Sequence, residues 1–218
     1  MSDAAQRTVL GAIRQHLAAA RREPGFVEPV LPAAAAARPA LDREAMLAEF
    51  AARLAAVGGV AWRVRDAAAA AECLAALAEQ LGATRFAASD APLVAAVLGG
   101  LRHPVQRVVG DGAHAVAEAE LGLSSAQAAI AETGSLLLDH RVERHRFVSL
   151  LPATHVALVP LGALVLDLDA ALATLRPGDL GPALTLVTGP SRTADIELTL
   201  VVGVHGPKAL HVVFVDEA

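Results

Sequence analysis

Three short segments of this 218-residue chain carry side chains that could do chemistry. The first is Glu132-Thr133-Gly134, which comes just before a run of three leucines. A carboxylate at the end of a strand could act as a nucleophile or general base if burial raised its pKa, and a glycine would let a ligand approach the backbone. An ordinary turn before a strand explains the same triplet, so both interpretations stay open.

The second segment, GPSRTADIE at residues 189–197, follows an apolar run. Its glycine and proline favour a turn, after which Ser191 or Thr193 could cap a helix with Asp195 in the first turn. Backbone N–H groups at such a turn, together with Arg192, would form a pocket for a phosphate or carboxylate. The alternative is a helix start whose acidic residues only complement the helix dipole.

The third segment is GVHGP at residues 203–207, where His205 lies between glycines and is followed by Gly206 and a proline. A rigid loop that presents an imidazole favours a functional histidine acting as acid, base or hydrogen-bond donor. His211 is a contrast, because it alternates with valines along a strand. We therefore assign His211 to structure.

Further histidines and arginines occur in DHRVERHRFVSLLP, but no carboxylate or cysteine stands at a recognisable ligand spacing from His140 or His145. We expect no metal site there. The segment is instead interpreted as a basic, solvated loop that bends over an anionic ligand through Arg144 or Arg146.

Composition excludes several classes of function. The net charge of −5 and the aromatic content of 3% argue against nucleic-acid binding. The chain is 55% hydrophobic, with a mean hydropathy of +0.48, yet its longest apolar run, Val156 to Leu166, is shorter than the roughly 18 residues of a spanning helix. We expect no membrane insertion and a cytoplasmic protein. The single cysteine, Cys73, can form no internal disulfide and cannot hold an iron–sulfur cluster alone.

Strand-like and helix-like segments alternate after residue 58, which predicts an α/β fold with an open, mostly parallel sheet and flanking helices. Residues 1–42 are expected to form an N-terminal helix, near residues 3–22, and a proline-rich and alanine-rich linker, while residues 43–218 form the α/β domain. Helices are predicted at 42–57, 66–82, 91–100 and near 168–178, and strands at 59–64, 83–89, 104–110, 135–139, 155–160, 183–189 and 209–216. Ligands of such sheets bind beyond the carboxyl ends of strands, where we expect the three segments to meet.

The order of these segments and their amino-acid sequences together resemble the lactate-utilisation C family, the LutC type of the LUD domain. The similarity covers about residues 43 to 218 and rests on AIAETGSLLLD, RFVSLLPATHVALVP and, most specifically, GPSRTADIELTLVVGVHGPKALHVVFVD.

The resemblance implies a fold related to the glucosamine-phosphate deaminase, ribose-phosphate isomerase and CoA-transferase group. It also implies that this chain is one of three proteins that jointly oxidise L-lactate to pyruvate, and that the partner proteins carry the iron–sulfur clusters. The motif match carries over candidate positions only: Glu132 and His205 as catalytic residues, and Thr133, Gly134, Ser191, Arg192, Thr193, Asp195 and Gly206 as residues that bind an anion or substrate.

The leading hypothesis is a non-redox or accessory subunit of an iron–sulfur L-lactate oxidation system, with a pocket for a small anionic metabolite or a cofactor of unknown identity. A second hypothesis is a self-sufficient isomerase or transferase acting on a phosphorylated or carboxylate metabolite through Glu132 and His205. A third is a regulatory module that binds a small acid.

Overall fold

The computed structural model describes residues 3–20, 41–104, 106–108, 112–143, 145–175, 183–193, 201–202 and 206–218. The chain divides into two compact units, Met1–Pro39 and Ala40–Ala218. In the first unit, helix α1 (Asp3–Ala20) leaves its larger apolar side chains exposed: Val9, Leu10, Ile13 and Leu17. Among the helices of the described residues, none has the length and apolar character needed to cross a membrane.

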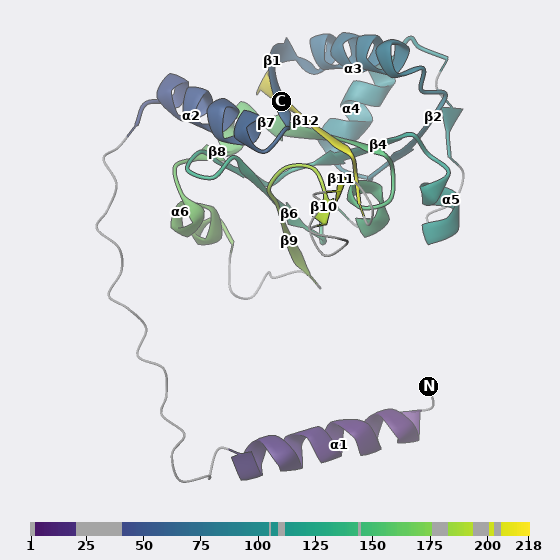
Figure 1. Ribbon diagram of the computed structural model, residues 1–218, viewed down its shortest axis with the longest axis vertical. Coiled ribbons are helices and arrows are strands. Elements are labelled where there is room, and N and C mark those ends of the chain that lie inside the picture. The colour runs from purple at the N-terminus through teal and green to yellow at the C-terminus, as the bar shows by residue number, and fades with distance from the viewer. Residues whose placement is uncertain are drawn as a thin grey trace. The chain divides into compact units, whose positions relative to one another are not determined.

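A six-stranded sheet forms the centre of the second unit (Figure 1). Its order is β1-β12-β7-β4-β2-β3, and every neighbouring pair is parallel. The predicted open, parallel α/β fold is therefore confirmed. The strands are β1 (Val60–Asp66), β2 (Arg85–Ala88), β3 (Gln106–Arg107), β4 (Leu121–Ser125), β7 (Thr154–Pro160) and β12 (Ala209–Glu217).

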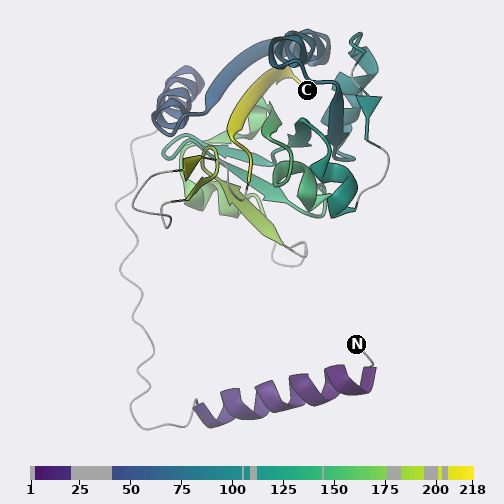
Figure 2. The same ribbon diagram turned by 45° about the vertical axis from the view of Figure 1, so that its right-hand side comes forward.

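Helices α3 (Ala67–Leu81) and α4 (Pro92–Gly100) pack side by side on one face of this sheet (Figures 1 and 2). Helix α3 begins and ends where the sequence predicts. The Asp66 side chain accepts a hydrogen bond from the Ala69 N–H at 2.9 Å, and Gly82 closes the helix with a left-handed φ of 61°. The core on this face joins Leu74 and Val94 of the helices to the sheet.

Helix α2 (Arg43–Ala56) and a second sheet cover the opposite face (Figure 2). The second sheet has the order β8-β5-β6-β9, with β5 antiparallel to β6 and β6 antiparallel to β9. Phe50 of α2 contacts Phe214 of β12 edge to face, with ring centroids 5.0 Å apart, and anchors the core on this side. The strands are β5 (Ala128–Ile130), β6 (Ser135–Asp139), β8 (Leu164–Val165) and β9 (Leu184–Val187).

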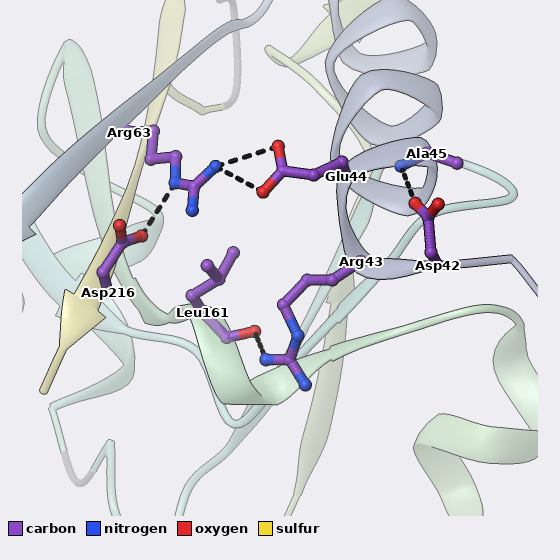
Figure 3. A network of polar contacts seen from close by, with 7 residues as sticks. All are labelled: Asp42, Arg43, Glu44, Ala45, Arg63, Leu161 and Asp216. Atoms are coloured by element: carbon purple, nitrogen blue, oxygen red, sulfur yellow. Dashed lines mark hydrogen bonds and ion pairs between the residues drawn. The ribbon is translucent and has the colours of Figure 1, made fainter.

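Charged side chains fix the start of α2 on the large sheet (Figure 3). The Arg63 guanidinium on β1 contacts Glu44 of α2 at 2.8 Å and Asp216 of β12 at 2.8 Å. The Arg43 guanidinium donates to the Leu161 carbonyl oxygen at 2.8 Å. Asp42 caps the helix as the sequence predicts, because its carboxylate accepts from the Ala45 N–H at 2.8 Å. These contacts join the start of α2 to β1, β12 and the turn at Leu161.

The remaining elements are short: α5 (Ala113–Ala117), α6 (Leu168–Ala173), the 3-10 turns η1 (Arg146–Ser149) and η2 (Leu161–Ala163), β10 (Arg192–Thr193) and β11 (Val201–Val202). The helix predicted to start at Ser191 is wrong, whereas a helix capped by Thr193 would begin within residues 194–200, which lie outside the described residues. Arg192 and Thr193 form β10, which pairs antiparallel with β11. The capping residues of the sequence are a local signal, and pairing with a later segment overrides it.

Candidate functional site

The second and third predicted segments meet in the structure. The Ser191 N–H donates to the Pro207 carbonyl oxygen at 2.9 Å. A Cβ atom on Gly206 would lie 3.0 Å from the Ser191 Cβ, so the two backbones approach more closely than a side chain at residue 206 would readily permit. Ser191 and Gly206, which are 15 positions apart in the sequence, therefore lie in contact.

The first segment joins the same region through a chain of hydroxyl groups. The Thr133 hydroxyl donates to the Ser135 oxygen at 2.7 Å, and the Ser135 and Thr188 oxygens lie 2.6 Å apart. Gly134 has a φ of +66°, and a Cβ atom there would lie 2.6 Å from the backbone nitrogen of Leu54 in α2. The turn therefore requires glycine so that it can pack against this helix.

Two of the predicted charged residues, Glu132 and Arg192, contact backbone carbonyl groups. Glu132 is half-buried in the turn, and its N–H donates to the Leu166 carbonyl oxygen at 3.0 Å. The Arg192 guanidinium donates to the Val57 carbonyl oxygen at 2.5 Å, at the carboxyl end of α2. A cation is favourable there because the last carbonyl groups of a helix carry partial negative charge.

Two further predicted residues, Asp195 and His205, lie outside the described residues. Thr193 is described as part of β10 by its backbone alone.

A pocket of about 220 Å³ lies where these loops meet the two sheets. Ser191 and Gly206, both predicted from the sequence, line it together with residues of β7, β9 and β12. His155 and Leu210, which face each other across the β7–β12 register, lie beside it near the amino ends of their strands. The expectation that the segments meet at the carboxyl edge is therefore wrong, since Gly206 precedes β12. The polar side chains that line the pocket are Ser149, His155, Thr185, Thr188 and Ser191.

His155 is the most constrained polar group of this pocket. Its side chain is buried with 1% exposure, and its Nε2 lies 2.7 Å from the Ser124 hydroxyl oxygen on β4. Its Nδ1 is buried and has no hydrogen-bond partner among the described residues. Burial lowers the pKa of the imidazole from 6.5 to about 4, so the ring is neutral at physiological pH.

A second group of buried polar side chains, around Glu143 at the carboxyl end of β4, connects to the pocket through His140 and Thr185. Glu143 is 2% exposed, and its Oε1 accepts a hydrogen bond from the Ser125 N–H at 2.9 Å. Burial raises the pKa of the Glu143 carboxyl group. His140 is also buried, with Nε2 2.8 Å from the Thr185 hydroxyl. The solvated loop predicted here is therefore wrong for both side chains. Among the described residues, no group of three or more histidine, cysteine or acidic side chains is arranged to hold a metal ion.

Sequence reasoning missed His155, Ser124, Thr185 of β9 and Thr188, which follows it. His155 follows a threonine and precedes an apolar run, a pattern that predicts a buried strand and gives no sign of a binding site. The available signal was that an imidazole at such a position must find hydrogen-bond partners. Chemically, the pocket offers neutral hydroxyl and imidazole groups on a partly apolar surface, and this suits a small molecule with oxygen atoms.

Residues 47–215 match the LUD domain family, and the chain belongs to that family. Among curated proteins, it is 37% identical over 107 residues to lactate utilization protein C of Anoxybacillus flavithermus, a match that covers 49% of each chain. It is 41% identical over 105 residues to lactate utilization protein C of Bacillus licheniformis, covering 45% of this chain and 44% of the relative. The matched region thus spans about half the length of these relatives.

A solved structure shares the fold. The crystal structure of a DUF162 family protein from Deinococcus radiodurans is 28% identical and superposes with a TM-score of 0.57. The similarity covers 81% of this chain and 99% of that chain.

Proposed function

We propose that this protein is a C-type component of an L-lactate oxidation system, in which it binds a small acid or a cofactor while iron–sulfur partner proteins carry the electrons. Membership of the LUD family and similarity to proteins named lactate utilization protein C support the choice of pathway. The observation that carries a ligand-binding role is the 220 Å³ pocket, which is built from the segments most specific to the resemblance.

The cysteine content supports a non-redox role. Iron–sulfur clusters are held by several thiolates, and Cys73 is the single cysteine of the chain. It lies half-buried on α3, and burial raises the pKa of its thiol, which disfavours the reactive thiolate. In this proposal electrons pass between partner proteins. A single cysteine also suits a reducing compartment, so we place the system in the cytoplasm.

The size of the pocket supports a small ligand. Sites for drug-sized molecules are about 300–1,000 Å³. At about 220 Å³ this pocket suits a metabolite of a few carbon atoms better than a nucleotide. A wider groove of about 590 Å³ adjoins it, shares Leu150 and Gly206 with it, and includes Lys208. Arg85 also lines this groove, where it is paired with Glu118 and Glu120.

The test is reconstitution of the complete system. This chain would be coexpressed with iron–sulfur lactate-utilisation proteins of its source organism, and L-lactate-dependent reduction of a dye would be measured with and without it. We expect activity only when the chain is present, and full activity without it would overturn the proposal.

The Cys73→Ser variant is the matched control for the non-redox role, since it removes the one thiol while leaving the pocket unchanged. We expect this variant to support wild-type activity. Loss of electron transfer in a correctly folded Cys73→Ser protein, or a cluster absorbance in the purified chain, would contradict the proposed division of labour.

A further inference from the structure

Helix α1 is the described part of the first unit, and it carries an apolar stripe that no described element of that unit covers (Figure 1). The stripe consists of four side chains that are between 41% and 59% exposed: Val9, Leu10, Ile13 and Leu17. Three of them recur at intervals of four residues, so they lie on the same side of the helix. These three also border one shallow hollow, together with Ala12 and His16. A continuous exposed stripe of this kind marks a contact surface, whereas single exposed apolar residues need no explanation.

A row of arginines borders the apolar stripe on one side. Arg7 and Arg14 are seven residues apart, which is close to two turns of helix. They lie three residues before Leu10 and four residues after it, and both spacings bring side chains together on a helix surface. Arg21 continues the same spacing in the sequence, outside the described residues. The arginine row, Arg7 and Arg14, therefore runs alongside the stripe.

The charge of this segment is opposite in sign to that of the whole chain. Asp3 is the single acidic residue of α1. The first unit holds five arginines and three acidic residues, whereas the whole chain has a net charge of −5. A basic, amphipathic helix on an otherwise acidic protein is typical of a segment that binds a negatively charged surface.

We propose that α1 binds the surface of an anionic lipid bilayer, with the apolar stripe at the boundary between headgroups and acyl chains and the arginine row on lipid phosphate groups. The helix would lie in the plane of the surface, a geometry that suits a basic amphipathic helix and needs no spanning segment. Arginines beside the stripe can reach the phosphates, because their long apolar stems lie along apolar surface while the charged groups stay in water. The cytoplasmic leaflet of a cell membrane supplies such anionic lipids. This role is separate from the proposed function, which concerns the second unit.

A second copy of the chain complements α1 less well than a lipid surface does. Helices that pair through an apolar stripe commonly carry acidic and basic residues on its borders, and these attract each other across the contact. In α1 the arginine row would meet a helix whose single acidic residue, Asp3, lies in the first turn. An anionic bilayer instead presents phosphate groups along the whole row, so charge complementarity requires no particular spacing.

The test is sedimentation of the full chain with lipid vesicles. One set of vesicles contains phosphatidylglycerol and phosphatidylcholine in equal parts, and the other contains phosphatidylcholine alone. Each arginine near an anionic surface strengthens binding by about five-fold, so the arginine row should give a preference of about twenty-fold or more for the anionic vesicles. We expect 1 M salt to remove most of this preference, because it screens the charges.

A matched pair of substitutions tests the apolar stripe. Gln6 lies seven residues before Ile13 and interrupts the stripe, whereas Gln15 lies on the opposite side of the helix. Gln6→Leu should strengthen binding to anionic vesicles by about ten-fold, and the same change at Gln15 should leave binding unchanged. Ile13→Gln should weaken binding by about ten-fold or more, since it removes one buried side chain. All three variants keep residues that favour helix or replace Ile13 with a better helix former.

Arg14 tests the nature of the anionic partner. Arg14→Gln should weaken binding by about five-fold, and Arg14→Lys should retain most of the wild-type affinity, because a phosphate-rich surface attracts either cation. A protein carboxylate held by both guanidinium nitrogens would distinguish the two cations, and lysine would not replace arginine there. Circular dichroism would verify that each variant has the wild-type secondary structure.

Two further measurements identify other occupants of the stripe. Sedimentation equilibrium without lipid would detect a dimer of the chain, and coexpression with iron–sulfur lactate-utilisation proteins would detect a protein complex. A dimer or complex that is lost in Ile13→Gln, from a chain that does not bind anionic vesicles, would assign the stripe to a protein and overturn the proposal. Equal binding to both sets of vesicles, or equal effects of Gln6→Leu and Gln15→Leu, would also overturn it.

Discussion

His155 should make the stability of this protein depend on pH, and the structure fixes both sign and size. Burial lowers the pKa of the imidazole from 6.5 to about 4. Below pH 6.5 the unfolded chain takes up a proton at this position that the folded chain does not bind. The free energy of unfolding therefore falls as pH decreases from about 6.5 to about 4, and the effect levels off below pH 4.

The magnitude follows from the gap between the two pKa values, about 2.5 units. Each unit corresponds to about 1.4 kcal/mol, so the histidine alone should remove about 3 kcal/mol of stability between pH 7 and pH 4. Because domains of this size are stable by only about 5–15 kcal/mol, such a loss is easily measured.

Urea unfolding at pH 7, 6, 5 and 4 would test this for the wild type and His155→Gln. Carboxyl groups that titrate in the same range contribute equally to both proteins, so the difference between the two curves isolates the imidazole. We expect that difference to change by about 3 kcal/mol across the range. His211→Gln is the control: its imidazole is half-buried with a lowered pKa, so its difference curve should be shallower. Parallel curves for wild type and His155→Gln would refute the reasoning.

Three further substitutions test the architecture around the site. Gly134→Ala should destabilise the protein by about 2–5 kcal/mol in urea, because it combines left-handed backbone strain with a Cβ contact 2.6 Å from the Leu54 backbone nitrogen. The control Gly82→Ala has a similar φ but open space around it, so it should lose only about 1–2 kcal/mol. Equal losses in the two variants would contradict the steric argument. Burial raises the pKa of the Glu143 carboxyl group, so the folded protein favours its neutral form. Glu143→Gln should therefore raise the free energy of unfolding at pH 7 and lose that advantage toward pH 4. A variant less stable than the wild type at pH 7 would argue against this. Arg63→Gln should lower the melting temperature more in dilute buffer than in 1 M salt, a difference that vanishes if its two carboxylate partners contribute nothing.

The elements that the sequence predicts best are those whose signals are local. Helix α3 begins at an aspartate cap and ends at a glycine, and its alanines repeat along one face, so its bounds follow from a short window. After Thr154 and His155, strand β7 is an apolar run, typical of a strand covered on both faces. Neither feature depends on a distant partner.

The errors arise where a distant segment decides the structure. Ser191 carries the signature of a helix cap, but the two residues after it, Arg192 and Thr193, pair with β11 and have an extended backbone. Glu143 belongs to a charged stretch typical of a solvent-exposed loop. Its side chain is nevertheless buried, and the Ser125 N–H at the end of β4 donates a hydrogen bond to it. Such pairings depend on tertiary packing, which periodicity and propensity do not encode.

The candidate site was predictable only where its residues belong to turns with a local sequence signal. Ser191 and Gly206 were identified because turns with small residues are readable in sequence, and both line the pocket. His155 was not, because its strand looks uniformly apolar and its partner Ser124 is on another strand. The roles assigned to Glu132 and His205 remain predictions.

The location of the pocket has a topological explanation. Between β7 and β12 the chain forms β8 and β9, and β9 joins the second sheet by pairing with β6. If the connection between β7 and β12 contained only helices, no strand of it would pack against the amino ends of the large sheet. Here the end of β9 and the loops at Ser191 and Gly206 are brought under the first residues of β7 and β12. The rule that ligands bind at the carboxyl ends of parallel strands assumes a single sheet. Where a second sheet packs against the first, a pocket can form between them at the opposite edge, and His155 is one of the residues that line it.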